Sequence, residues 1–290
     1  MRLPTTSTEP GAAPVAAVTD EWDVDRLDLG AYLRRIGHDS DTAPTEGTLT
    51  ALHRAHVDAI AFENIDVVLG RGVAVDLDSV QAKLVRRRRG GYCYEHGVLF
   101  GAALQRLGYC VTRLLARVGG DGPHARARTH MILRVATEAE SWLADVGFGS
   151  GLLEPLPFAA GSPRTQGGWT YELARTGPRS WQVRERQGED WVTLYGFDDE
   201  RQLPADVVMS NHFTSTFPKS PFVGQLIVVR KDADSIRRLI GRRLVHSRRD
   251  LSTEERDLSD SEVADALHDV FRVTLGSEEL AQLTAALPPV

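Results

Sequence analysis

The sequence predicts an α+β fold in which a helical N-terminal part precedes a mainly β central part and a mixed C-terminal part. Apolar residues recur at three- and four-residue steps up to about residue 107, which is the period of helices that bury one face. From residue 109 to about 195 the period changes to two, in short runs separated by turns. Helices followed by a run of strands are typical of α+β proteins.

Four stretches before residue 109 share the helical period. They cover residues 28–36, 48–60, 79–87 and the run from Cys93 to just before Gly108. Asp28 is a suitable N-cap for the first of them. Four consecutive arginines, 86–89, end the third, where the helix dipole favours cations. A solvated helix end is therefore expected there, in preference to a nucleic-acid contact.

Six stretches of alternating character follow. They cover residues 111–118, 129–135, 141–146, 170–175, 181–186 and 191–195. Such a run of short strands favours a barrel or a sandwich. The rest is expected to form a helix at 199–211, a strand at 222–230, a strand pair at 235–247, a helix at 259–271 opened by a Ser259/Glu262 capping box, and a last helix capped by Ser277.

Composition excludes several classes of protein. The formal net charge of −6 gives no general attraction to nucleic acid or acidic membranes. No apolar run approaches the ~20 residues that cross a bilayer, and residues 1–20, which lack the pattern of a secretion signal, are expected to be a mobile tail. Two cysteines, Cys93 and Cys110, cannot form a disulfide framework and fit a cytoplasmic protein.

The strongest chemical signal is the stretch 89–97 (RGGYCYEHG). Cys93 follows a glycine pair and precedes an amphipathic run, so it is expected at the start of a helix. The unpaired N–H groups and the dipole at that position favour a thiolate, which is the nucleophilic form of cysteine. A lone cysteine near an apolar helix face is more often an inert buried residue, so the assignment needs a base and an orienting group.

His130 and Asp145 can supply both. They lie on two expected strands separated by a turn at 137–140, and adjacent antiparallel strands can place their side chains together. A carboxylate there would fix the imidazole tautomer and stabilise the imidazolium. By contrast His53 and His56, although suitably spaced for a metal, have no third ligand at a typical spacing and are expected to be structural or surface residues.

Several motifs, in this order, resemble those of the arylamine N-acetyltransferases. They are residues 61–66 (AFENID), 89–95 (RGGYCYE), 129–131 (THM), 145–149 (DVGFG) and 210–222 (SNHFTSTFPKSPF). The resemblance implies that Cys93 is the nucleophile, His130 the base and Asp145 the orienting acid. The sequence departs from the family pattern at Ala61, where many relatives carry proline.

The resemblance also implies a cysteine-protease-like catalytic core divided among several domains. After the tail, they are a helical bundle at 21–108 carrying the nucleophile, a β-barrel at 109–198 carrying the histidine and aspartate, an interdomain helix and linker at 199–222, and an α/β lid at 223–290. A salt bridge between Glu63 and Arg89 is expected to hold the cysteine loop.

The ligands implied by the resemblance are acetyl-CoA and a small-molecule amine, with no metal, nucleic acid or membrane, and the oligomeric state stays open. Phe148 is expected to line the acceptor pocket. The residues expected to contact coenzyme A are Arg126, Phe213, Ser215, Thr216, Lys219 and Ser220.

The expected reaction is a ping-pong transfer in which an acetyl group passes through a Cys93 thioester to an arylamine or hydrazine. Three alternatives remain. An amide synthase of the same family would take a bulkier acyl chain, and a cysteine peptidase or transglutaminase-like enzyme would use the same three groups with another acceptor. A non-catalytic binding protein could keep the fold alone.

Overall fold

The computed structural model describes residues 20–40, 42–119, 126–250 and 252–288. The expected mobile tail, apart from Asp20, lies outside these residues. The N-terminal part is helical, and its elements are η1 (Val24–Arg26), α1 (Leu29–Ile36), α2 (Glu46–Ala59), β1 (Phe62–Glu63), α3 (Ile65–Val68), α4 (Leu77–Gln81), the π-helical turn η2 (Ala82–Arg86) and α5 (Cys93–Arg106). Asp28 caps α1 as predicted, because its carboxylate accepts from the Ala31 N–H at 2.8 Å.

The arginine run behind η2 is not uniformly solvated. The first three arginines are exposed, whereas Arg89 is 3% exposed. The expectation of a solvated helix end is therefore wrong for Arg89, because its guanidinium lies 2.8 Å from the buried Glu63 carboxylate.

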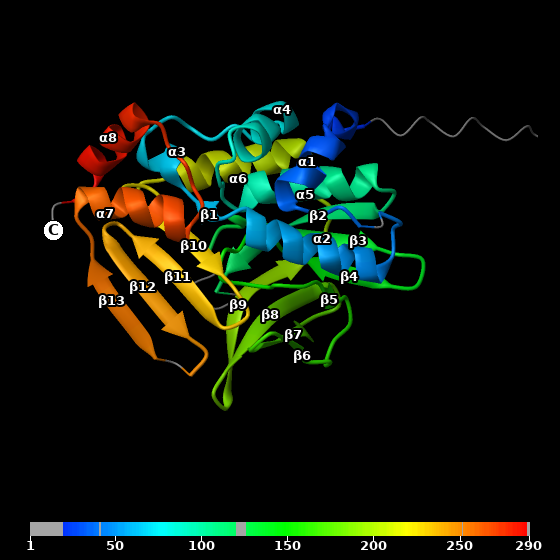
Figure 1. Cartoon of the computed structure of the whole chain (residues 1–290). Coiled ribbons are helices and arrows are strands. Elements are labelled where there is room, and N and C mark those ends of the chain that lie inside the picture. Colours follow the sequence, from blue (N-terminus) through cyan, green and yellow to red (C-terminus); the bar gives the residue numbers. More distant parts are fainter. Residues whose placement is uncertain (1–19, 41, 120–125, 251, 289–290) are drawn as a thin grey trace, which may run out of the picture.

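An antiparallel, barrel-like sheet of eight strands forms the centre of the molecule (Figure 1). Its strands are β2 (Cys110–Val118), β3 (His130–Ala136), β4 (Ser141–Ala144), β5 (Leu156–Pro157), β6 (Arg164–Gln166), β7 (Trp169–Arg175), β8 (Ser180–Gln187) and β9 (Asp190–Asp198), in the order β5-β4-β3-β2-β9-β8-β7-β6. The sequence predicts six of them, and it misses β5 and β6 because two or three residues are too few to show a period.

A second sheet of five strands combines one strand of the N-terminal part with four strands of the C-terminal part. Its order is β1-β10-β11-β12-β13, with β10 (Ile227–Lys231), β11 (Ser235–Ile240), β12 (Arg243–Arg248) and β13 (Thr253–Asp257). The helices of this part are α6 (Pro204–Thr216), α7 (Asp260–Asp265), the π-helical turn η3 (Ala266–Val270) and α8 (Ser277–Ala286). Glu262 accepts from the Ser259 N–H at 2.9 Å, as the predicted capping box requires.

Two predicted elements begin five residues later than expected: the helix expected at 199–211, and the strand expected at 222–230, which is β10. The helix expected at 199–211 is α6, five residues further along, because Pro204 fits the first helical turn, where its missing N–H costs nothing. Residues 61–64, where no strand is predicted, contain strand β1, in which Phe62 pairs with Val229 of β10 and bridges to Gly91. The loop before Cys93 is thereby joined to the C-terminal sheet.

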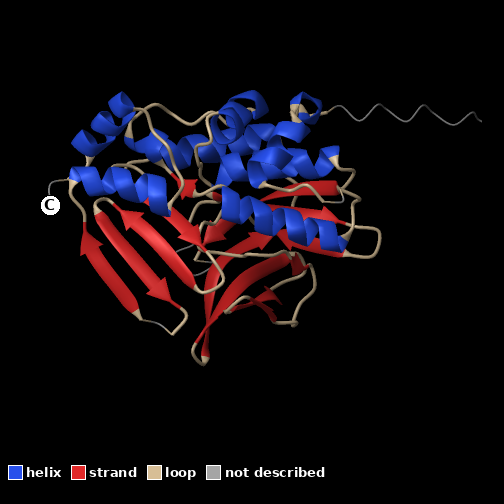
Figure 2. Ribbon diagram, viewed as in Figure 1, coloured by secondary structure: helices blue, strands red, loops and turns tan. Residues whose placement is uncertain are grey.

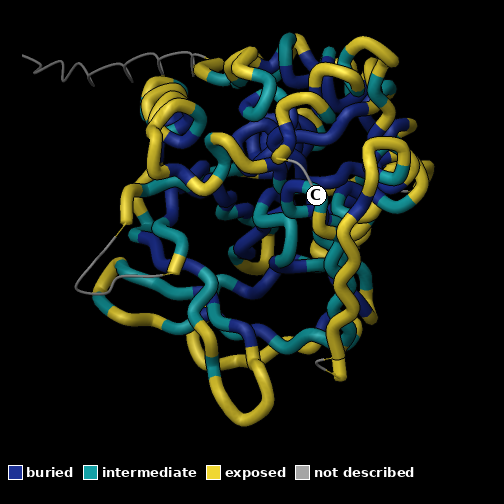
Figure 3. The backbone as a smooth tube through the Cα atoms, turned by 90° about the vertical axis from the view of Figure 1, so that its left-hand side faces the viewer, coloured by how far each residue is buried: buried dark blue, intermediate teal, exposed yellow. Residues whose placement is uncertain are grey.

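Figure 2 shows most helices on one side of the molecule and the two sheets next to each other on the other side. Three clusters of buried apolar side chains hold these parts together: one between the helices and the barrel wall, one between the five-stranded sheet and α7, η3 and α8, and one inside the barrel. Helix α5 lies in the first cluster, and every residue from Cys93 to Leu104 is buried. Figure 3 shows buried segments inside the molecule and exposed segments at its margins. Within the described residues, no helix has both the length and the apolar character needed to cross a membrane.

Candidate active site

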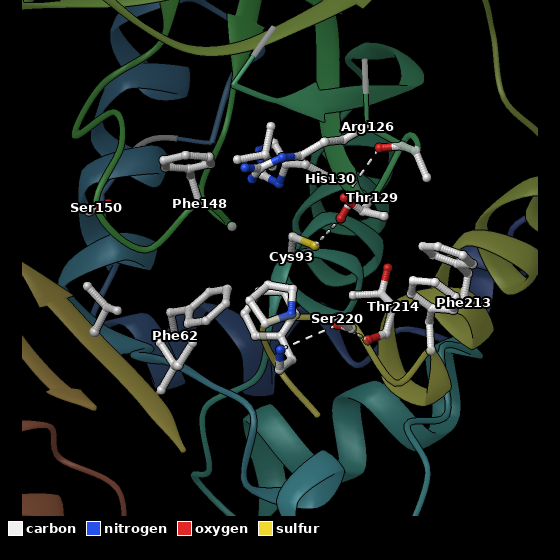
Figure 4. Close-up of a pocket in the computed structure, with 18 of the residues that line it drawn as sticks. Phe62, Cys93, Arg126, Thr129, His130, Phe148, Ser150, Phe213, Thr214 and Ser220 are labelled. Carbon is white, nitrogen blue, oxygen red and sulfur yellow. Dashed lines mark hydrogen bonds between the residues drawn. The ribbon is translucent and has the colours of Figure 1, made fainter. Parts of the chain in front are cut away.

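Cys93 is the first residue of α5 and lies at the bottom of a cavity (Figure 4). The glycine pair before it is needed for space, because a Cβ at Gly90 would come within 2.3 Å of the Ala61 carbonyl oxygen. The helix start is closed by Glu95, which accepts from the Tyr92 N–H at 3.0 Å. The first helical N–H groups, including that of Cys93, have no partner within the helix and point toward the cavity end of α5.

His130 and Asp145 meet because of the register of β3 and β4. Leu133 pairs with Ala144, so Asp145, the residue that follows β4, is a diagonal neighbour of His130 on the same face. The His130 Nε2 and the Asp145 Oδ2 lie 2.8 Å apart. Strand β4 ends one residue before Asp145, earlier than predicted, because the Asp145 Oδ1 accepts from the Gly147 N–H at 3.0 Å and turns the chain.

The three groups share one electrostatic environment. Burial alone lowers the pKa of His130, but the Asp145 charge and hydrogen bonds to Asp145 and Cys93 raise it to about 10. Burial alone raises the pKa of Asp145, and the His130 charge together with hydrogen bonds holds it below its ordinary value. Near neutral pH, the histidine is therefore an imidazolium between a carboxylate and a sulfur, an arrangement suited to nucleophilic catalysis by cysteine.

Residues around the pair of His130 and Asp145 hold these two side chains in position. The backbone N–H of Asp145 donates to the His53 Nε2 at 3.2 Å, and the His53 Nδ1 donates to the Leu153 carbonyl at 3.0 Å. The His130 ring packs against Phe148 and Tyr195, with centroid distances of 5.1 and 4.9 Å. Tyr195 was missed by the sequence reasoning, since it comes from β9, 65 positions further along.

The other two histidines of this part form a buried chain of hydrogen bonds under the cysteine loop. The Tyr32 hydroxyl lies 2.8 Å from the His56 Nδ1, and the His56 Nε2 lies 2.8 Å from the His96 Nδ1. The His96 Nε2 donates to the Gly91 carbonyl at 3.0 Å. His56, like His53, is thus a buried structural residue, and no group of three or more His, Cys, Asp or Glu side chains among the described residues could hold a metal ion.

A buried ion cluster supports the loop from below. The Arg89 guanidinium contacts the Glu63 Oε1 at 2.8 Å and reaches Glu279 of α8 at 2.7 Å. The Lys83 ammonium contacts Asp66 at 2.6 Å and Glu95, the residue that closes the Cys93 helix start, at 2.9 Å. The cysteine loop is therefore anchored to the helical part and to α8.

The cavity has a volume of about 740 Å³, and most but not all of the residues predicted to contact a ligand line it. Of the predicted residues, those that line it are Cys93, Arg126, His130, Phe148, Phe213, Lys219 and Ser220. Ser215 and Thr216 do not, because they lie inside α6, where their hydroxyls donate to the carbonyls of Asn211 and His212. Phe62, Phe222 and Arg238 line the cavity without having been predicted to do so.

Known proteins resemble this chain over most of its length. A family model described as N-acetyltransferase matches residues 46–280. The arylamine N-acetyltransferase of Mycolicibacterium smegmatis is 39% identical over 257 residues, which cover 86% of this chain and 93% of that protein.

Solved structures give the same result. The arylamine N-acetyltransferase of Mycobacterium abscessus superposes with a TM-score of 0.87 at 36% identity and covers 94% of this chain and 99% of its own. The Mycobacterium marinum enzyme, solved in complex with CoA, superposes with a TM-score of 0.82 at 34% identity, covering 90% of this chain and 100% of its own. The chain belongs to the arylamine N-acetyltransferase family of acyltransferases.

Proposed function

We propose that this protein transfers an acetyl group from acetyl-CoA to an arylamine or hydrazine through a thioester on Cys93. The observation that carries the proposal is the contact between His130 and Asp145, 2.8 Å long, next to a cysteine at a helix start on a cavity wall. The CoA complex of the related Mycobacterium marinum enzyme supports the choice of donor. By composition, with only two cysteines, the reaction would take place in the cytoplasm.

In the first half of the reaction, the Cys93 thiolate attacks the acetyl carbonyl carbon, and the backbone N–H groups at the start of α5 stabilise the oxyanion. The bond between the acetyl carbon and the CoA sulfur then breaks, and the new bond between that carbon and the Cys93 sulfur remains. The departing CoA sulfur takes the proton of the His130 imidazolium, and the Asp145 carboxylate keeps the ring in position.

In the second half, the amine nitrogen attacks the thioester carbon. His130, now neutral, accepts the proton that the nitrogen loses, and Cys93 leaves as a thiolate. The starting thiolate and imidazolium are thereby restored. The aromatic rings beside Cys93 suit a flat acceptor, because Phe148 packs edge to face against the His130 ring and lines the cavity.

Coenzyme A would bind along the side of the cavity formed by α6 and the segment after it. Lys219 in this segment and Arg126, which precedes β3, both line the cavity and can contact phosphates. Phe213 and Phe217, stacked at 4.5 Å between centroids, offer an exposed aromatic surface. Ser220 also lines the cavity there.

The experiment that tests the proposal is a panel of arylamines, hydrazines and alkylamines incubated with acetyl-CoA and scored for release of the CoA thiol. The parent protein should release thiol continuously with arylamines or hydrazines, and without an amine it should release no more than the one equivalent that accompanies acetylation of Cys93. The Cys93→Ala variant should release none. Continuous thiol release that does not depend on an amine would instead identify a hydrolase.

A further inference from the structure

We propose that Arg238 binds a carboxylate carried by one of the two substrates, so that this enzyme prefers an anionic acceptor or an anionic acyl group. The inference rests on the proposed function and adds a substrate class to it. Its basis is a half-buried guanidinium in the wall of the catalytic cavity that has no partner among the described residues.

The position of Arg238 follows from sheet register. Phe62 pairs with Val229, and Val229 pairs with Arg238, so the three residues form a row across β1, β10 and β11 on one face. All three line the cavity that contains Cys93. With strands about 4.8 Å apart, the row extends about 10 Å from Phe62 to Arg238.

The charge of Arg238 is unusual in this place. Its guanidinium makes no hydrogen bond or ion pair with any residue in the described part of the chain, and burial lowers its pKa from the ordinary value. The Glu185 carboxylate acts on the Arg238 guanidinium through its charge, but it already has other partners. It lies 3.3 Å from the Lys231 ammonium and accepts from the Tyr171 hydroxyl at 3.0 Å. A desolvated cation without a partner costs free energy, which an anionic ligand would offset.

The rest of the cavity is also suited to an anionic ligand. No aspartate or glutamate lines it within the described residues, and its walls beside Phe62 are aromatic and aliphatic. The other cations that line it, apart from His130, come from different segments: Arg126 precedes β3, and Lys219 follows α6. An arylamine whose nitrogen faces Cys93 and whose ring lies against Phe62 would direct a far carboxylate along the row toward Arg238, where a guanidinium can bind it bidentately.

The test compares 4-aminobenzoate with 4-aminobenzamide, which has nearly the same shape without the charge, as acceptors from acetyl-CoA. The quantity measured is the ratio of their kcat/KM values in the parent, in Arg238→Met and in Arg237→Met. Arg237 is the neighbouring residue of the same strand, faces the other side of the sheet and pairs with Asp232 at 2.8 Å, so it is the matched control. We expect the ratio to fall about 10- to 100-fold in Arg238→Met, the size of a charged hydrogen bond, and to stay at the parent value in Arg237→Met.

A second arm distinguishes the two sources of the carboxylate. Acylation of Cys93 by succinyl-CoA and by acetyl-CoA is followed by mass spectrometry in the same proteins. A selective loss with succinyl-CoA in Arg238→Met places the carboxylate on the acyl group, and a selective loss with 4-aminobenzoate places it on the acceptor.

Equal effects of Arg238→Met on charged and neutral substrates in both arms would overturn the proposal. A rise in the KM for acetyl-CoA as the sole change would also overturn it, because Arg238 would then be a contact of the coenzyme. Failure of the proposed function has a different result, because the parent protein would then acetylate neither acceptor.

Discussion

Gly147 lies directly against Cys93: a Cβ placed on Gly147 would come within 2.8 Å of the Cys93 Cα and 3.0 Å of the Cys93 carbonyl oxygen. The turn that follows Asp145 therefore packs on the backbone of the nucleophile itself. This contact makes the distance between the helix that carries the sulfur and the strands that carry its partners sensitive to a single methyl group.

Gly147→Ala should lower the free energy of unfolding by about 1–3 kcal/mol, because the added methyl group meets backbone atoms that cannot move aside cheaply. The kcat/KM for arylamine acetylation should fall by at least about tenfold as Cys93 shifts. Urea unfolding and steady-state kinetics measure the two effects. Gly47→Ala is the control, since its Cβ would have its nearest contact at 3.9 Å. Parent-like activity in Gly147→Ala would show that the contact is dispensable.

Asp145→Asn should reduce the rate of Cys93 acetylation by about 10³- to 10⁴-fold, because an amide removes the charge that keeps His130 an imidazolium. The measurement is single-turnover acetylation followed by mass spectrometry, with circular dichroism to establish that the variant is folded. A loss smaller than tenfold in a folded variant would mean that the carboxylate does not govern the histidine.

Lys83→Met should destabilise the protein by about 3–5 kcal/mol, since it leaves the buried Glu95 carboxylate without its cation and removes the nearer of the two cations that contact Asp66. The matched control is Arg54→Met, which removes an exposed ion pair with Glu154 and should cost less than about 1 kcal/mol. Denaturant unfolding at pH 7 compares them. Similar costs for the two variants would argue that the buried cluster contributes no more than a surface pair.

Acid should weaken the fold through the buried histidines. Burial lowers the pKa values of His53 and His96 to about 4, whereas the unfolded chain titrates near 6.5. Between these values the unfolded state binds more protons, so the free energy of unfolding should fall as the pH drops from about 6.5 to 4. His130, with its raised pKa, keeps its full contribution throughout this window, because both its folded and its unfolded forms are then protonated.

Unfolding by urea at several pH values checks the acid effect. His96→Gln removes one of the titrating groups and should reduce the slope by up to about 1.4 kcal/mol per pH unit. An unchanged slope in that variant would assign the acid sensitivity to other groups.

Local signals in the sequence predicted the parts of the site that depend on nearby residues. A glycine pair before an amphipathic run places Cys93 at the start of α5, and the spacing of two strands around a turn places Asp145 beside His130. The limits of α6 were missed because the proline signal at Pro204 competes with the polar run before it. The strand at Phe62 was not predicted because its partner, Val229, lies in a distant part of the chain.

The contacts that sequence reasoning missed are of the same long-range kind. Tyr195 and Arg238 reach the site from β9 and β11, where nothing in their neighbouring residues indicates a cavity. Ser215 and Thr216, which were expected in the cavity wall, do not line it for the opposite reason. Their composition suggests a polar binding loop, but hydroxyls inside a helix can donate to carbonyls one turn earlier, and these do.

The central claim is the acetyl-cysteine intermediate, and the most direct test is mass spectrometry of the protein after incubation with acetyl-CoA in the absence of an amine. The account predicts one added acetyl group, mapped to the peptide that contains Cys93 and removed when an arylamine is supplied. A preparation that acetylates arylamines without ever carrying an acetyl group on Cys93 would contradict it.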